Sequence, residues 1–69
     1  MLYKVRFDDK NLAINAKPAG KEALHRSRGY IQWTQKNRLD MIQCIYVYAW
    51  DRKEAMEHAN KKAASFLGW

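Results

Sequence analysis

The feature that most constrains this chain is the passage from an apolar strand into a capped helix near its C-terminus. Residues 44–50 read Cys-Ile-Tyr-Val-Tyr-Ala-Trp, and β-branched and aromatic residues of this kind favour a strand. Asp51 follows as a good N-cap, with Glu54 placed where its carboxylate reaches back to the cap amide. Alanines then recur every four residues as far as Leu67, and Gly68 predicts the stop.

The rest of the chain predicts strands ahead of this unit. Residues 2–7 alternate strictly, and residues 12–16 predict a second, weaker strand. The apolar side chains that this second strand places on one face are Leu12, Ile14 and Ala16. Residues 30–36 predict a third strand, joined to the last one by a polar turn over residues 36–40. We therefore expect one small α+β domain over residues 1–69, with an antiparallel three- or four-stranded sheet and the C-terminal amphipathic helix on one face.

The chain length and the cysteine count limit the ways in which this domain can be stabilised. A domain of 69 residues is marginally stable without good packing or a partner, so self-association as a homodimer stays open. Cys44 is the only cysteine, so no disulfide forms within the chain. It has no paired-ligand spacing with His25 or His58, so no metal and no cofactor is expected.

The start of the chain has no secretory signal and no apolar run is long enough to cross a membrane, which predicts a cytoplasmic protein.

Nearly all of the net charge of +6 lies in the middle of the chain. Residues 17–38 hold six Lys or Arg and one Glu. Within this segment, residues 21–28 predict either a short helix that stops at Gly29 or a basic loop. Such a cluster attracts nucleic acid or an acidic protein surface, and the same residues also serve as an ordinary solvated surface in many proteins.

Alternation gives the last strand two unlike faces. The aliphatic face, which suits the alanine-rich helix, consists of Ile45, Val47 and Ala49. The opposite face, which starts at Cys44, is aromatic and continues with Tyr46, Tyr48 and Trp50. If the helix covers the aliphatic face, the aromatic row lies on the other side of the sheet. The residues expected to join it there are Tyr30, Gln32, Thr34, Lys4 and Arg6.

Aromatic rings interleaved with basic groups stack exposed bases and hold phosphates, so the sequence predicts a small basic nucleic-acid-binding module. The candidate binding residues, from this face and from the basic segment, are Lys4, Arg6, Lys21, Arg26, Arg28, Tyr30, Lys36, Arg38, Tyr46, Tyr48 and Trp50. The aromatic row also fits a second core covered by residues 17–29, a self-association surface, or a surface for a partner protein.

Catalysis is not expected from these residues. Ser27 and Ser65 have no Gly-flanked nucleophile setting, and Cys44 within a strand is typical of a packed hydrophobe. His25 and His58 have no acidic partner fixed by spacing, although Glu54 precedes His58 by one helical turn. The sequence also has no phosphate-cradling Gly-rich loop.

Residues 29–67 place strands before a helix that starts at Asp51-Arg52-Lys53-Glu54-Ala55. This order resembles the three-stranded-sheet-plus-helix DNA-binding domains at the front of some phage-type integrases, and the resemblance assigns no residue roles. The small size and the aromatic content also resemble short phage-encoded accessory proteins, including inhibitors of host defence. The alternative function is therefore an accessory protein that binds a host protein complex without catalysis.

Overall fold

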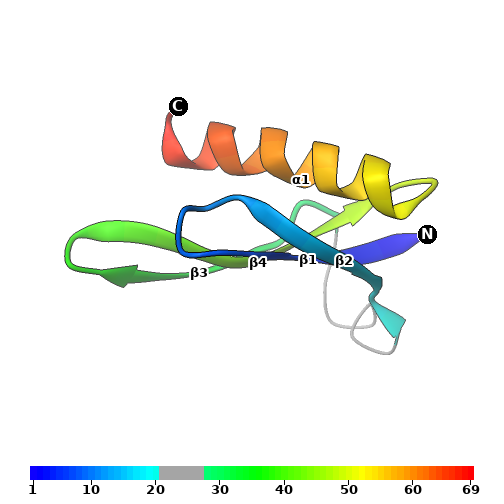
Figure 1. The fold of residues 1–69 in the computed structure, drawn as a ribbon, viewed down its shortest axis with the longest axis horizontal. Helices are drawn as coiled ribbons and strands as arrows, with labels where there is room; N and C mark the ends of the chain where they lie inside the picture. The colour runs from blue at the N-terminus through cyan, green and yellow to red at the C-terminus, as the bar shows by residue number, and fades with distance from the viewer. Residues whose placement is uncertain (21–27) are drawn as a thin grey trace.

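The computed structural model describes residues 1–20 and 28–69, which form a four-stranded antiparallel sheet with one helix on one face (Figure 1). The elements are β1 (Leu2–Phe7), β2 (Ala13–Pro18), β3 (Ile31–Lys36), β4 (Leu39–Tyr48) and α1 (Arg52–Leu67). The order in the sheet is β2-β1-β4-β3, so β1 and β4 are central. The predicted α+β fold is confirmed, with four strands. Among the residues described, no helix has the length and apolar character needed to cross a membrane.

The segment expected to form a short helix or a basic loop, residues 21–28, falls outside the described residues except for Arg28. Gly29, the expected stop, is described and has a φ of 79°. Its backbone N–H donates a hydrogen bond of 2.6 Å to the carbonyl of Tyr46. This bond fixes the entry of the chain into β3 against the edge of β4.

The helix α1 begins and ends close to where its sequence predicts. The backbone N–H of Glu54 donates to Oδ1 of Asp51 at 2.8 Å, which confirms Asp51 as the N-cap. The carboxylate of Glu54 accepts from the backbone N–H of Trp50 at 3.2 Å, one residue before the cap amide that we predicted. At the other end Gly68 adopts a φ of 77°, the left-handed conformation that favours glycine after a helix.

The main core lies between α1 and the sheet. Three alanines at four-residue spacing bury completely against the strands, and their small side chains let the helix lie close: Ala55, Ala59 and Ala63. The residues of β4 and the following turn that share this core are Ile42, Ile45, Val47 and Ala49. The predicted pairing of the alanine stripe with the aliphatic strand face is therefore confirmed.

A β-bulge changes the faces of β2. Opposite β1, Asn15 and Ala13 occupy successive positions and Ile14 is skipped. Ile14 is 54% exposed, and Leu12, which precedes the strand, is exposed as well. The prediction that these two side chains share a face with Ala16 is wrong, because the extra residue shifts the alternation. Only Ala16 of the three reaches the core.

The hairpin of β3 and β4 extends beyond the central part of the sheet (Figure 1). β1 pairs with residues 44–48 of β4, whereas β3 pairs with β4 from Leu39 to Ile45. Two residues form the turn, Asn37 with a φ of 54° and Arg38 with a φ of 65°. Positive φ at both positions is typical of a type I′ turn, which matches the twist of the strands. The outer part of the hairpin is therefore a two-stranded ribbon with Arg38 at its tip.

Candidate nucleic-acid interface

The sheet face turned away from α1 carries polar and basic side chains from β1, β2 and β3. We refer to this surface as the basic face, and it consists of Lys4, Arg6, Lys17, Gln32, Thr34 and Lys36. These side chains line two open depressions of about 600 and 310 Å³, which share Lys4 and Arg6. The basic face is therefore one continuous, shallow surface across the sheet.

The strand register brings positive charges into adjacent positions on the basic face. Lys4 of β1 lies directly opposite Lys17 of β2. Side chains at directly opposite positions have Cβ atoms about 4.5–5.5 Å apart, and like charges there are destabilising. Arg6 lies two positions further along β1, on the same side of the strand as Lys4. The register alone therefore concentrates cationic groups where β1 meets β2.

An amide side chain continues this face toward β3. Cys44 of β4 lies between Arg6 on one side and Gln32 on the other. The thiol of Cys44 donates a hydrogen bond of 3.5 Å to Oε1 of Gln32. Because this bond engages the oxygen, the amide nitrogen is the part of Gln32 that is available as a donor to a ligand. Arg6 on β1 and Gln32 on β3 thus present hydrogen-bond donors on either side of Cys44, in one row across the strands.

Two carboxylates, Asp8 and Asp9, line the same depression at the end of β1. Oδ1 of Asp8 accepts hydrogen bonds of 2.9 Å from the backbone N–H groups of both Lys10 and Leu12. This carboxylate therefore has a structural role, which is to close the turn between β1 and β2. The two acids offset positive charge in the depression that they share with Lys36, whereas the depression lined by Lys4, Arg6 and Lys17 includes no acid among the described residues.

The aromatic part of the predicted site differs from the prediction. Tyr46 is 2% exposed and packs with Leu2, Ala19 and Cys44 in a second core on this side of the sheet. The ring of Tyr30 meets it edge-on, with ring centroids 5.9 Å apart. The prediction that Tyr46 offers an exposed stacking surface is wrong, because its ring fills this small core. The second-core alternative therefore holds for Tyr46.

The other two members of the aromatic row are exposed, but the basic face does not include them. Tyr48 is 53% exposed and lines a different pocket, beside α1, together with Arg28. Trp50 is 91% exposed and lies in the turn that leads into α1. The three rings predicted to form a row thus lie in three different places: the second core, the pocket beside α1 and the turn before α1. Base stacking by a continuous aromatic row is not available to this fold.

The basic candidates are also distributed. The structure brings three of them together on the basic face: Lys4, Arg6 and Lys36. Arg38 lies in the turn directly after Lys36. Arg28 lies at the pocket beside α1. The remaining two fall outside the described residues: Lys21 and Arg26.

Three residues of the basic face were not among the predicted site residues: Lys17, Gln32 and Thr34. Alternation predicts Gln32 and Thr34 on this face of the sheet, although the sequence did not single them out as binding residues. Lys17 was missed because the predicted second strand ended at residue 16, whereas β2 continues to Pro18. With Ala16 buried under α1, Lys17 necessarily points to the opposite face.

No protein-family model, curated protein or solved structure matches this chain. The chemistry of the basic face is therefore the guide to its function. Four cationic side chains, an amide and a hydroxyl lie together there, with two carboxylates at one end. Such a set binds anions and hydrogen-bond acceptors spread over an extended ligand.

Proposed function

We propose that this chain is a non-catalytic nucleic-acid-binding module that uses the basic face as its contact surface. The observation that carries the proposal is the gathering of four basic side chains from three strands on the open side of the sheet. Lys and Arg side chains arranged in this way contact phosphates along a strand. Gln32 and Thr34, which lie among them, supply hydrogen-bonding groups for sugars or base edges.

The burial of Tyr46 shapes the expected mode of binding. An exposed ring that stacks on a base contributes about 1–3 kcal/mol, and Tyr46 cannot make this contact. Phosphate contacts therefore dominate, and they weaken steeply as salt concentration rises. Because a duplex has a higher charge density than a single strand, a duplex should bind at least as tightly as a single strand of the same length.

The position of Arg38 adds support. Its φ of 65° lies in the left-handed region, where a residue with a Cβ is strained and glycine is the usual choice in a type I′ turn. A charged residue at a strained position is typical of a site where function outweighs stability. Arg38 lies in the hairpin turn two residues after Lys36, so it adds a cation close in sequence to the β3 end of the basic face.

A titration of a labelled duplex, followed by fluorescence anisotropy at several salt concentrations, tests the proposal. We expect binding at low salt, and we expect Arg6→Gln to weaken it. The slope of log affinity against log salt concentration should also become less steep, by about the amount that one phosphate contact contributes. The matched control is Lys53→Gln, which removes the same charge from an exposed position on α1 away from the basic face. Absence of binding at low salt, or equal losses in both variants, would refute the proposal.

A partner-protein surface is the second candidate, and the exposure of Trp50 favours it. Trp50 is 91% exposed, and Met1 is also largely exposed. The N-terminal amine of Met1 donates to the carbonyl of Ala49, so both apolar side chains lie at one end of the molecule. Trp is enriched in protein interfaces. A host-protein partner that survives nuclease treatment in a pull-down, and is lost with Trp50→Ser, would favour this function over nucleic-acid binding.

A further inference from the structure

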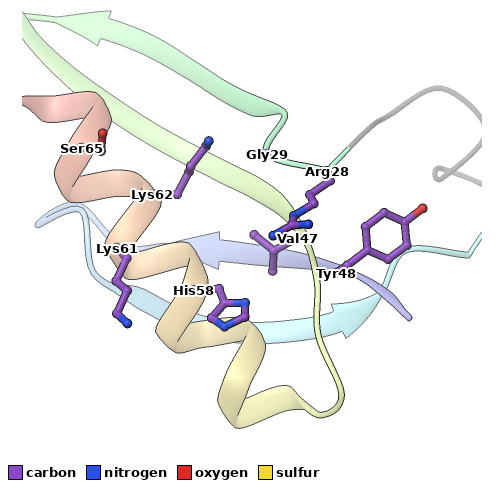
Figure 2. A pocket seen from close by; sticks show the side chains of 8 residues that line it. All are labelled: Arg28, Gly29, Val47, Tyr48, His58, Lys61, Lys62 and Ser65. Atoms are coloured by element: carbon purple, nitrogen blue, oxygen red, sulfur yellow. The ribbon is translucent and has the colours of Figure 1, made fainter.

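A second pocket, away from the basic face, lies between the edge of β4 and α1 (Figure 2). It forms because β3 pairs with β4 only as far as Ile45. Two further backbone hydrogen bonds join Tyr46 to the residues before β3, one from the N–H of Gly29 to its carbonyl and one from its N–H to the carbonyl of Tyr30. Beyond that point Val47 and Tyr48 have α1 on one side and no β3 beside them. The resulting cavity of about 680 Å³ is within the size range of small-ligand pockets.

The side chains around this pocket are strongly basic. Arg28 comes from the segment before β3, whereas His58, Lys61 and Lys62 come from α1. Figure 2 shows the guanidinium of Arg28 directed toward the helix, with His58 and Lys62 across the same space. No carboxylate is among the described residues that line the pocket. The ammonium of Lys61 is directed away from Arg28 in Figure 2, so the positive charge in this concave site comes from Arg28 and Lys62. A concave site attracts anions more strongly than a flat surface does.

The contact between Lys62 and Gly29 shows how closely the two sides of the pocket approach. A Cβ atom built on Gly29 would lie 3.1 Å from Cε and 3.3 Å from Nζ of Lys62. The ammonium of Lys62 thus reaches from the helix to the backbone next to Arg28. His58 and Ser65 are four residues before and three residues after Lys62, so all three lie on one face of α1. An anion held here would meet donors from both sides of the pocket.

We propose that this pocket binds the phosphate group of a nucleotide, either a free nucleotide or the terminal nucleotide of a nucleic-acid strand. Arg28 offers paired N–H donors, Lys62 a point charge, and Ser65 a hydroxyl donor. Val47, which lies between Arg28 and His58 in Figure 2, supplies apolar surface for the sugar and base, whereas the ring of Tyr48 is directed away from α1. The inference goes beyond the proposed function, because none of these residues belongs to the basic face.

An NMR titration of the labelled full-length chain tests the pocket with inorganic phosphate, adenosine 5′-monophosphate and adenosine. We expect saturable shifts at Gly29 and Val47 with the two phosphates, and none with adenosine. Arg28→Gln and Lys62→Gln should each weaken the nucleotide about tenfold, since each removes a charged hydrogen-bond donor. Lys53→Gln on the same helix is the control for net charge and should leave the affinity unchanged. Equal weakening by the control, or no saturable shift, would overturn the inference.

Oligonucleotides with and without a 5′-phosphate distinguish the two sources of the phosphate. Tighter binding of the phosphorylated strand, with the difference removed by Lys62→Gln, identifies a strand end as the ligand. Binding of the mononucleotide without any effect of the 5′-phosphate identifies a free nucleotide. The pocket and the basic face are separable, because Arg6→Gln should weaken unphosphorylated duplex binding and leave the shifts with adenosine 5′-monophosphate unchanged. If Arg6→Gln abolished those shifts, the assignment to the pocket would be wrong.

Discussion

Lys4 and Lys17 lie directly opposite each other on β1 and β2, so two ammonium groups share one end of the basic face. Like charges at directly opposite positions lower the stability of an antiparallel pair. The same juxtaposition raises the local positive potential on an open surface. A phosphate that contacts this end of the face would relieve the repulsion, which connects the stability of the sheet to its proposed binding role.

Substitution of Lys17 should separate stability from binding. We expect Lys17→Gln to leave the free energy of unfolding unchanged or to raise it by up to about 1 kcal/mol, because it removes the repulsion with Lys4. Duplex affinity should fall and its salt dependence should decrease. Chemical denaturation and anisotropy titrations measure the two effects. An unchanged duplex affinity would mean that Lys17 does not contact nucleic acid.

At the hairpin tip, we expect that a substitution of Arg38 raises stability and weakens nucleic-acid binding. Arg38→Gly should raise the free energy of unfolding by about 0.5–1 kcal/mol, because glycine relieves the strain of a positive φ. The same change should weaken duplex binding through the loss of a cation. Asn37→Gly is a matched control, since it alters the same turn at a φ of 54° without removing charge. If the two variants bind a duplex equally well, Arg38 has no binding role.

The two tyrosines of β4 should respond differently to truncation. Tyr46→Ala should lower the free energy of unfolding by about 3–5 kcal/mol, because it empties the second core. Tyr48→Ala should change it by less than about 1 kcal/mol, because its ring is 53% exposed. Urea denaturation of both variants measures the difference. Similar losses at the two positions would contradict the burial of Tyr46 and the exposure of Tyr48 on this face of β4.

Asn11 links the β1–β2 turn to the outer part of β4. Its Oδ1 accepts from the backbone N–H of Ile42 at 2.9 Å, and its Nδ2 donates to the carbonyl of Asp40 at 3.0 Å. Asn11→Ala should cost about 1–3 kcal/mol of stability, because it leaves two partly buried backbone groups unpaired and strains a φ of 61°. Asn11→Gly keeps the φ accessible, so it should cost less. Equal unfolding midpoints for the wild type and Asn11→Ala would rule out this linkage.

Local sequence signals predicted the elements well and the irregularities poorly. The strict alternation of residues 2–7 and the cap at Asp51 gave the bounds of β1 and the start of α1. The bulge at Ile14 had no local signal, because it depends on how β2 registers against β1. The same holds for the burial of Tyr46. Alternation determines its face, whereas its burial depends on Leu2 and Ala19, which tertiary packing brings to it.

For the candidate surfaces too, local sequence predicts the face on which a residue lies but not which distant residues lie beside it. Alternation predicted that Lys4 and Arg6 lie on the side of the sheet away from α1, and the structure confirms this placement. The periodicity of α1 shows only that Lys61 and Lys62 avoid the buried stripe. It does not show that Arg28 lies across from them, because that neighbour comes from a segment about thirty positions earlier in the chain. Sites assembled from distant segments therefore require the structure.

The central claim, that the basic face is the nucleic-acid contact surface, is tested most directly by mapping NMR shifts during titration with a short unphosphorylated duplex at low salt. The account predicts that the largest saturable shifts cluster at backbone amides of the strands that carry this surface, including those of Arg6, Lys17 and Gln32. Amides on the outer side of α1, such as those of Lys53 and Glu57, should shift little. Shifts concentrated on α1, or no saturable change at all, would contradict the account.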